Sequence, residues 1–371
     1  MKRILLVGQQ QSSSGLLRYT ADALRNKGCE VIPIDAQTLF WPKLWPTLKG
    51  FSFHKDTWYR RRWEANLYSP EAWDRNSRLN GRLLDRIRRP GDILLHMAKE
   101  HFPHPSYASL PYYVFIQSCL TVELRGGVAP WIPKPEDQPP FMERERRLFQ
   151  SARKVFTGAR YVQEPLRQVY GVPPERLSLG GGGADDFFLE HMPDSPRARP
   201  VFNMIMVGWD FGMKGGHDAV AALHLARQTL PSLTLTLVGP PHDATPDAPG
   251  LIKIGPLRDR TRLLDLYQKA DLFVLPSLYD TFGFVFCEAM SQGLPCIGTD
   301  FNAMPELIGE GINGYLVPRR NPEALAAKIV QFYSNPSNLP RMSAESLRRV
   351  QTEFTWSHVA DRLLAGMEET L

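Results

Sequence analysis

Short apolar runs alternate with helix-compatible segments along both halves of this 371-residue chain. Each run has the length of one buried strand, and such alternation is typical of parallel sheets wrapped by helices. The predicted strands of the first half are residues 4–7, 31–34, 93–95, 113–116, 155–156 and 177–179. Those of the second half are residues 202–207, 233–238, 252–254, 272–275, 296–297 and 314–317. The sequence therefore predicts an α/β protein with two parallel sheets.

The length favours two domains, because a single hydrophobic core rarely serves more than about 250–300 residues. Between the two sets of strands, residues 193–200 are rich in Pro and charge and have no apolar period, which is typical of a linker. We therefore expect a first domain at residues 1–192 and a second at 201–353. Residues 354–371 have helical spacing and are expected to form a terminal helix.

The composition is that of an ordinary soluble globular protein, with 43% hydrophobic and 22% charged residues. No apolar segment approaches the ~20 residues of a membrane-spanning helix, and the N-terminus lacks the layout of a signal peptide. These features predict a cytoplasmic protein. The four cysteines have neither metal-ligand nor disulfide-framework spacing, so no metal is expected.

Two carboxylates, Asp280 and Glu288, follow one predicted strand of the second half. A polar turn leads to Gly283, and residues 284–292 contain no Pro or Gly and can form a helix. The unpaired N–H groups at the start of that helix favour an anion such as a phosphate. The segment therefore predicts a site for a sugar joined to a phosphate. Alternatively, Asp280 caps the helix and Glu288 lies on its surface.

A second polar segment, residues 207–217, follows the first strand of the second half and contains Lys214 among several glycines. Backbone amides and one ammonium in such a turn can bind a diphosphate. The alternative is a surface turn with a solvated lysine. Its place after a strand of the same predicted sheet favours the first interpretation.

Both segments resemble those of the family 4 retaining glycosyltransferases, which use nucleotide-sugar donors. In that family the first acidic residue lies beside the sugar hydroxyls and the second binds the ribose, roles that fall on Asp280 and Glu288. The resemblance implies a donor-binding segment made of Asp280, Thr281, Phe282, Gly283, Phe284 and Glu288. The family more often has Glu at the first position, so Asp280 leaves the identity of the sugar open.

In the same family, a lysine equivalent to Lys214 contacts the donor phosphates, commonly with an arginine a few residues before it. Here no arginine lies between Pro200 and Lys214, and Trp209 is among the residues in its place. Either one charge is missing here, or Arg258 or Arg260, from the next loop, supplies it.

The first half offers weaker candidates. Gly15 ends the loop after the first strand, where an open parallel sheet borders its ligand, and is a candidate donor contact. His96 follows the third strand, and the family frequently has a histidine near the sugar there; His101 and His104 compete for this role. The glycines at 180–183 and the nearby Asp185 resemble a family segment that lines the ligand site.

The resemblance implies the GT-B architecture: two Rossmann-like domains facing across a cleft, with a C-terminal helix crossing back to the first. It also implies hexosyl transfer to an acceptor hydroxyl with retention, by a front-face reaction without metal, and a role in glycan, glycolipid or cell-surface polysaccharide synthesis. The expected catalytic residues are Lys214, Asp280 and His96, and a UDP-sugar is the favoured donor. A sugar-nucleotide epimerase and a noncatalytic nucleotide-sugar-binding protein remain as alternatives.

Residues 40–89 carry five of the eight tryptophans and twelve Lys and Arg against five Asp and Glu. This local excess of positive charge exceeds the net charge of +5 of the whole chain. Aromatic and basic residues together suit an anionic acceptor or the inner face of an anionic membrane, where each basic residue contributes about 1 kcal/mol. The alternatives are solvated helix faces with buried tryptophans, or nucleic acid, which we do not expect as a partner.

Overall fold

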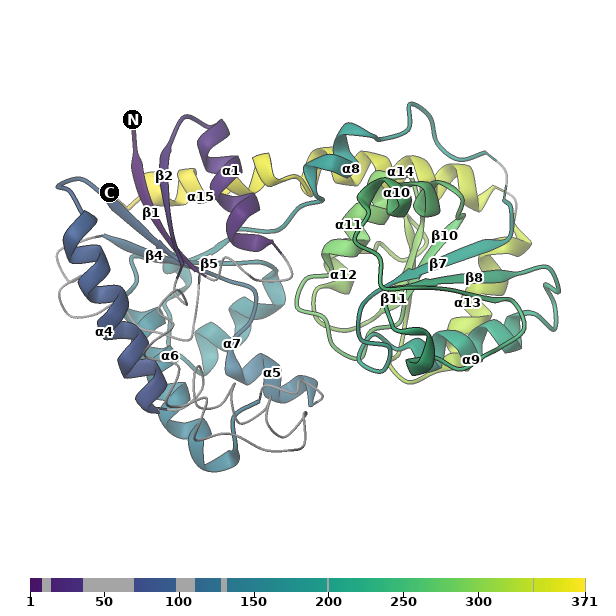
Figure 1. The fold of residues 1–371 in the computed structure, drawn as a ribbon, viewed down its shortest axis with the longest axis horizontal. Helices are drawn as coiled ribbons and strands as arrows, with labels where there is room; N and C mark the ends of the chain where they lie inside the picture. Colours follow the sequence, from purple (N-terminus) through teal and green to yellow (C-terminus); the bar gives the residue numbers. More distant parts are fainter. Residues whose placement is uncertain are drawn as a thin grey trace. The chain divides into compact units, whose positions relative to one another are not determined.

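The computed structural model describes residues 1–8, 15–35, 70–97, 111–127, 132–198, 200–335 and 337–370. These residues form two compact α/β units (Figure 1). The first comprises Met1–Gly181 with Val359–Leu371, and the second comprises Gly182–His358. Each unit is built on its own sheet.

The first unit contains a six-stranded parallel sheet with strand order β2-β1-β3-β4-β5-β6. Its strands are β1 (Arg3–Gly8), β2 (Glu30–Asp35), β3 (Ile93–His96), β4 (Tyr112–Ile116), β5 (Lys154–Thr157) and β6 (Leu177–Leu179). Its described helices are α1 (Leu16–Asn26), α4 (Pro70–Ile87), α5 (Leu120–Gly126), α6 (Gln138–Ser151) and α7 (Gln163–Gln168), with short 3-10 turns η3 (Pro135–Asp137), η4 (Arg160–Val162) and η5 (Pro174–Arg176).

The second unit repeats this architecture with strand order β12-β11-β10-β7-β8-β9, again parallel throughout. Its strands are β7 (Asn203–Val207), β8 (Thr234–Val238), β9 (Leu251–Gly255), β10 (Leu272–Leu275), β11 (Cys296–Thr299) and β12 (Gly314–Val317). Its helices are α8 (Asp186–Glu190), α9 (Gly216–Ala226), α10 (Arg260–Gln268), α11 (Phe284–Ser291), α12 (Met304–Leu307), α13 (Pro322–Ser334) and α14 (Asn338–Glu353), with the 3-10 turn η6 (His242–Ala244). Helices α9 and α13 cover one face of the sheet, and α10, α11 and α14 cover the other (Figure 1).

The apolar runs become strands because both faces of each sheet are covered. Every residue of β4 and β10 is buried, which leaves no position for a solvated side chain. All twelve predicted strands are confirmed, as is the α/β fold with two parallel sheets.

The strand orders place a topological switch point in each sheet. Chain connections leave in opposite directions from β1 and β3 in the first unit, and from β7 and β10 in the second. In open parallel sheets a ligand binds beside the carboxyl ends of the strands at such a point. The topology therefore predicts a ligand site at the loops after β7 and β10 in the second unit.

The unit boundary lies earlier than the linker expected at residues 193–200. Residues 182–198 belong to the second unit because side chains hold them there. The Arg197 guanidinium donates to the carbonyls of Tyr267, Ala270 and Gln292, and Phe188 packs edge-on against the Tyr267 ring. The Pro-rich composition thus marks an anchored segment of the second unit.

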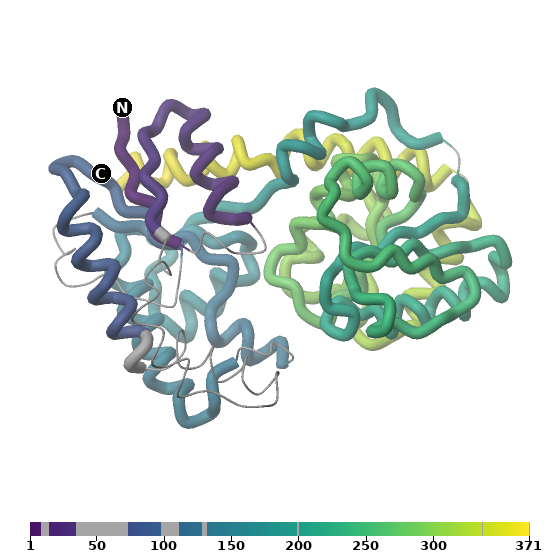
Figure 2. The backbone as a smooth tube through the Cα atoms, viewed as in Figure 1, coloured from purple at the N-terminus to yellow at the C-terminus, as the bar shows by residue number. Residues whose placement is uncertain are grey.

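The last helix, α15 (Trp356–Glu368), begins in the second unit and continues into the first. Within the first unit it runs beside the N-terminal strand (Figure 2), where Lys2 pairs with Glu368 and Lys27 with Asp361. The terminal helix expected at residues 354–371 is therefore present. Among the residues that the structure describes, no helix is long and apolar enough to cross a bilayer.

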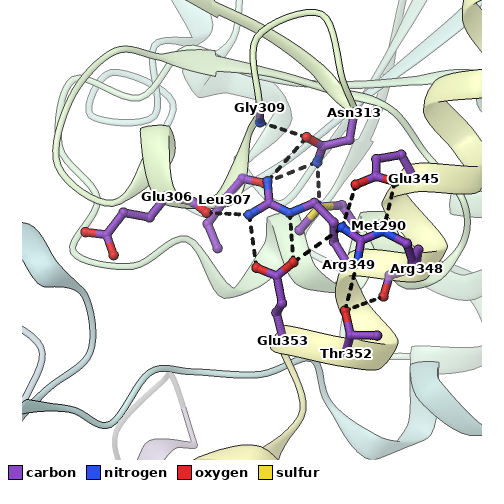
Figure 3. Close-up of polar contacts among 10 residues, drawn as sticks. All are labelled: Met290, Glu306, Leu307, Gly309, Asn313, Glu345, Arg348, Arg349, Thr352 and Glu353. Carbon is purple, nitrogen blue, oxygen red and sulfur yellow. Dashed lines mark hydrogen bonds and ion pairs between the residues drawn. The ribbon is translucent and has the colours of Figure 1, made fainter.

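Arg349 of α14 connects this helix to the end of α12 in the second unit (Figure 3). Its guanidinium donates to the carbonyls of Glu306 and Leu307 at 2.9 and 2.8 Å and pairs with Glu353. Asn313 completes the network by donating to the Leu307 carbonyl and accepting from the Gly309 amide. These contacts satisfy the carbonyls that end α12 and fix the connection to β12.

Candidate functional site

Loops after β7 and β10 meet at the switch point of the second unit. The Leu278 amide donates to the Met213 carbonyl at 2.9 Å and joins the two loops directly. A third loop, after β11, contributes Asn302, whose side-chain amide donates to the Asp280 carbonyl at 2.9 Å. The topology therefore assembles the two polar segments that the sequence singled out.

The Lys214 ammonium lies 2.6 Å from Asp280 Oδ2, and both side chains are only slightly exposed. Asp280 also accepts from the Phe282 amide through Oδ1 at 3.3 Å. Asp210 holds the β7 loop in shape, because its carboxylate accepts from the Met213 amide at 2.7 Å. An ammonium and a carboxylate are thus paired at the carboxyl edge of the sheet.

Two glycines allow the loops to approach this closely. Gly215 has φ 74°, and a Cβ there would lie 1.9 Å from the Pro276 carbonyl oxygen. Gly283 has φ 88° and is the N-cap of α11, a left-handed backbone conformation that favours glycine. Thr281, Phe282 and Phe284 flank this glycine, and Phe284 begins α11 as predicted.

Glu288 lies in the second turn of α11 and is partly buried. The Tyr267 hydroxyl donates to its Oε2 at 3.2 Å. Burial raises the pKa of the Glu288 carboxyl to about 7, while the hydrogen bond from Tyr267 lowers it, Asp185 raises it and Arg260 lowers it by smaller amounts. This carboxyl therefore changes charge near neutral pH.

The replacement cations proposed for the absent arginine differ in their surroundings. Both side chains are exposed, and Arg260 pairs with Asp185, its Nη2 lying 2.7 Å from Oδ2. Asp185 also caps α8 by accepting from the Phe187 amide at 3.1 Å. Trp209, in the place of the absent arginine, is 62% exposed.

Arg319, after β12, is a site candidate that the sequence did not indicate. Its guanidinium lies 3.6 Å from the centroid of the Phe301 ring and donates to the Leu278 carbonyl at 3.0 Å. Burial lowers the pKa of the Arg319 guanidinium, and the neighbouring Arg320 lowers it further. No local motif marks this residue, because its partners lie on the loops of two other strands.

In the first unit, Gly15 directly precedes α1 and His96 is the last residue of β3. Gly15 has φ 62° and caps α1, again without a side-chain hydrogen bond. His96 ends β3 beside Val7 of β1 and is 2% exposed. His101, His104 and all the tryptophans at 40–69 lie outside the described residues.

Gln117 is a first-unit candidate that sequence reasoning missed. It follows β4, and both polar atoms of its side chain are buried without a hydrogen-bond partner among the residues that the structure describes. A Cβ on Gly158 would lie 1.8 Å from Gln117 Oε1, so the glycine makes room for this amide. An unpaired buried amide costs stability and is therefore a candidate for ligand binding. Its only sequence signal is a polar residue directly after an apolar strand.

The glycines at 180–183 allow close packing. A Cβ on Gly182 would lie 2.5 Å from the Phe282 ring, and one on Gly183 would lie 2.6 Å from the Thr355 backbone. The Ala184 amide donates to the Phe354 carbonyl at 3.0 Å. In the described part of the chain, His, Cys, Asp and Glu side chains form no group able to hold a metal ion.

Part of this chain resembles known proteins in sequence. Residues 201–335 match the family model of the glycosyl transferases group 1. A glycogen synthase from Mycobacterium tuberculosis is 28% identical over 221 residues, which cover 57% of this chain and 53% of that protein. This chain thus spans about half the length of the curated relatives it matches.

Solved structures resemble the whole chain. A sucrose-phosphate synthase from Thermosynechococcus elongatus has a TM-score of 0.70 at 16% identity, covering 100% of this chain and 99% of that one. A UDP-forming α,α-trehalose-phosphate synthase from Burkholderia xenovorans has a TM-score of 0.68 at 14% identity, covering 100% and 99%. The resemblance stated from the sequence is confirmed to this extent: the chain has the GT-B fold, and residues 201–335 match the glycosyl transferases group 1.

Proposed function

We propose that this protein transfers a hexosyl group from a nucleoside diphosphate sugar to an acceptor hydroxyl, with retention of the anomeric configuration. The Lys214–Asp280 pair carries the proposal, since it lies before the amino end of α11 at the switch point of a group 1 domain. The products we propose are glycans, glycolipids or cell-surface polysaccharides.

The chemistry follows from the charges. Breaking the bond to the anomeric carbon leaves negative charge on the diphosphate, which Lys214 and the α11 amides would stabilise. Asp280 lies against Lys214 and would fix both the ammonium and a sugar hydroxyl. The proposed reaction needs no metal, because the acceptor proton can pass to the departing phosphate.

We propose a UDP-sugar as the donor. The name of the Burkholderia relative includes UDP as its product, and Glu288 offers a carboxylate for the ribose hydroxyls. Arg258 is the replacement cation that we favour, because the Arg260 guanidinium is already paired with Asp185. The donor contact of Gly15 and the acid–base role of His96 complete the proposal and remain predictions.

A product assay tests this function against its alternatives. Purified protein is incubated with UDP-, GDP- or ADP-glucose and a panel of hydroxyl acceptors, and the nucleotide and sugar products are separated. Release of a nucleoside diphosphate with a glycosylated acceptor supports the transferase. An altered but intact sugar nucleotide identifies an epimerase, and binding without any turnover identifies a noncatalytic protein.

We further propose a peripheral contact with an anionic membrane through residues 40–89, at the cytoplasmic face. In the described part of this region, Arg78, Arg82 and Arg86 are exposed at four-residue spacing along α4. Trp73 is buried against Phe141, so it stabilises the packing of α4. The proposed membrane contact therefore rests on the charges of the three arginines.

Vesicle sedimentation tests this contact. Binding to phosphatidylserine vesicles, and none to phosphatidylcholine vesicles, is expected at low salt. Changing Arg78, Arg82 and Arg86 to Gln removes about 3 kcal/mol of attraction and should abolish sedimentation. Equal binding of the triple variant and the parent protein would refute the contact.

A further inference from the structure

Tyr267 and Glu288 link two neighbouring helices of the second unit. Tyr267 lies on α10, is fully buried, and donates its hydroxyl to Glu288 Oε2 at 3.2 Å. Its ring packs edge-on against Phe188, with centroids 5.6 Å apart, and tilted against Phe273 at 6.3 Å. Because two aromatic contacts fix the ring, the hydroxyl restrains the position of the carboxylate.

Two charged groups near Glu288 shift its pKa in opposite directions. Asp185 at the start of α8 and Arg260 at the start of α10 both act on it, and they pair with each other. The adjacent Cys287 thiol is buried, which raises its pKa, so it stays neutral. Burial holds the pKa of Glu288 at about 7, with Tyr267 acting to lower it. The carboxylate form thus depends on donated hydrogen bonds.

We propose that Tyr267 is a positioning residue, whose hydroxyl fixes one oxygen of Glu288 so that the carboxylate can accept both hydroxyls of a ribose diol. This inference rests on the proposed function, in which Glu288 binds the donor ribose. A carboxylate has about four lone-pair sites, so one bond from Tyr267 leaves enough acceptors for two ligand hydroxyls.

The pairing predicts how donor binding depends on pH. Ribose binding needs the carboxylate, so affinity falls as the pH drops through the pKa of Glu288. Removing the Tyr267 hydroxyl removes a bond that favours the charged form. The midpoint of the pH dependence must then move upward.

The second unit offers a matched control. Tyr333 is also buried and donates its hydroxyl to the Asp271 carboxylate at 3.3 Å. Asp271 directly precedes β10, at the opposite end of that strand from Asp280. Tyr333→Phe therefore removes the same type of bond without touching the candidate site.

The test measures the affinity of the full-length protein for UDP, GDP and ADP, and for their 2′-deoxy analogues, between pH 5.5 and 9. Tyr267→Phe is expected to raise the midpoint by about one pH unit and to weaken ribonucleotide binding roughly tenfold at pH 6.5. Binding should recover above pH 8.5, and the preference over the deoxy analogue should shrink. In turnover, KM for the donor should rise with little change in kcat.

Two further measurements test whether Tyr267 acts through Glu288. In a Glu288→Gln background, Tyr267→Phe should have no additional effect on binding, which isolates the pair. Identical pH profiles for Tyr267→Phe and Tyr333→Phe would overturn the inference. If no nucleotide binds at all, the proposed function fails. NMR titration of Glu288 in the ligand-free protein then still tests the pair: an unshifted midpoint in Tyr267→Phe refutes it.

Discussion

Lys214 and Asp280 are paired at 2.6 Å across two loops that follow neighbouring strands, β7 and β10. The pair joins the only cation of the β7 loop, residues 208–215, to the carboxylate that precedes α11. In the proposed function, a diphosphate at this point would meet an ammonium that Asp280 already holds in place. Preorganised charge of this kind stabilises a leaving group without reorganisation.

Lys214→Met should lower kcat/KM for the sugar donor about 100-fold, equivalent to about 2.7 kcal/mol of transition-state stabilisation. Lys269→Met is the matched control, because Lys269 pairs with Asp265 on the exposed surface of α10. Donor-dependent turnover is measured for both. Equal activity of the two variants would remove Lys214 from the mechanism.

Gly215→Ala should destabilise the protein by roughly 3 kcal/mol, since the new Cβ meets the Pro276 carbonyl and φ is positive. Gly311→Ala is the control: φ is 70°, and nothing lies within 4 Å of its Cβ, so about 1 kcal/mol is expected. Denaturant unfolding measures both. Similar losses would show that the two loops need not approach closely.

Gln117→Leu should raise the free energy of unfolding by about 1 kcal/mol, because it removes a buried amide that has no hydrogen-bond partner in the described part of the chain. The same change should lower kcat/KM at least roughly tenfold if the amide binds ligand. Gln163→Leu serves as control, since Gln163 donates to Thr157 Oγ1 at 3.2 Å and its loss should only destabilise. A Gln117→Leu variant with full activity would assign this amide no role.

Arg197→Met should cost about 3 kcal/mol of stability, because several carbonyls lose a charged donor at once. Burial lowers the pKa of Arg197 to about 10, so it is still charged at neutral pH. Arg197→Lys should recover only part of the loss, since one ammonium cannot reach all the carbonyls. Full recovery with Lys, measured by denaturant unfolding, would contradict the anchoring role.

The sheets could be predicted from the sequence because each strand is a short apolar run that is buried on both faces. Residues 272–275 show this most clearly, since all four are apolar and all four are buried in β10. The start of α11 could be predicted in the same way, because Gly283 and Phe284 mark it through local backbone chemistry. Each of these two signals is contained within a few neighbouring residues of the sequence.

The remaining features depend on partners that are distant in sequence. Tyr267 meets Glu288, and Gln117 meets Gly158, only because the fold brings their strands and helices together. The sequence predicts a linker at 193–200 because Pro and charge are also typical of linkers. The segment is held to the second unit by Arg197. The sequence around a single arginine does not indicate which carbonyls it contacts.

The most direct test of the central claim is a thermal-shift screen of the purified protein against UDP-, GDP- and ADP-glucose and the free diphosphates. Ligand at about 100 times its Kd stabilises the native state by about 2.7 kcal/mol, so Tm should rise by several degrees for one nucleotide series. The rise should be much smaller in Lys214→Met than in Lys269→Met. An unchanged Tm with every nucleotide and nucleotide sugar at millimolar concentration would contradict the proposed donor site.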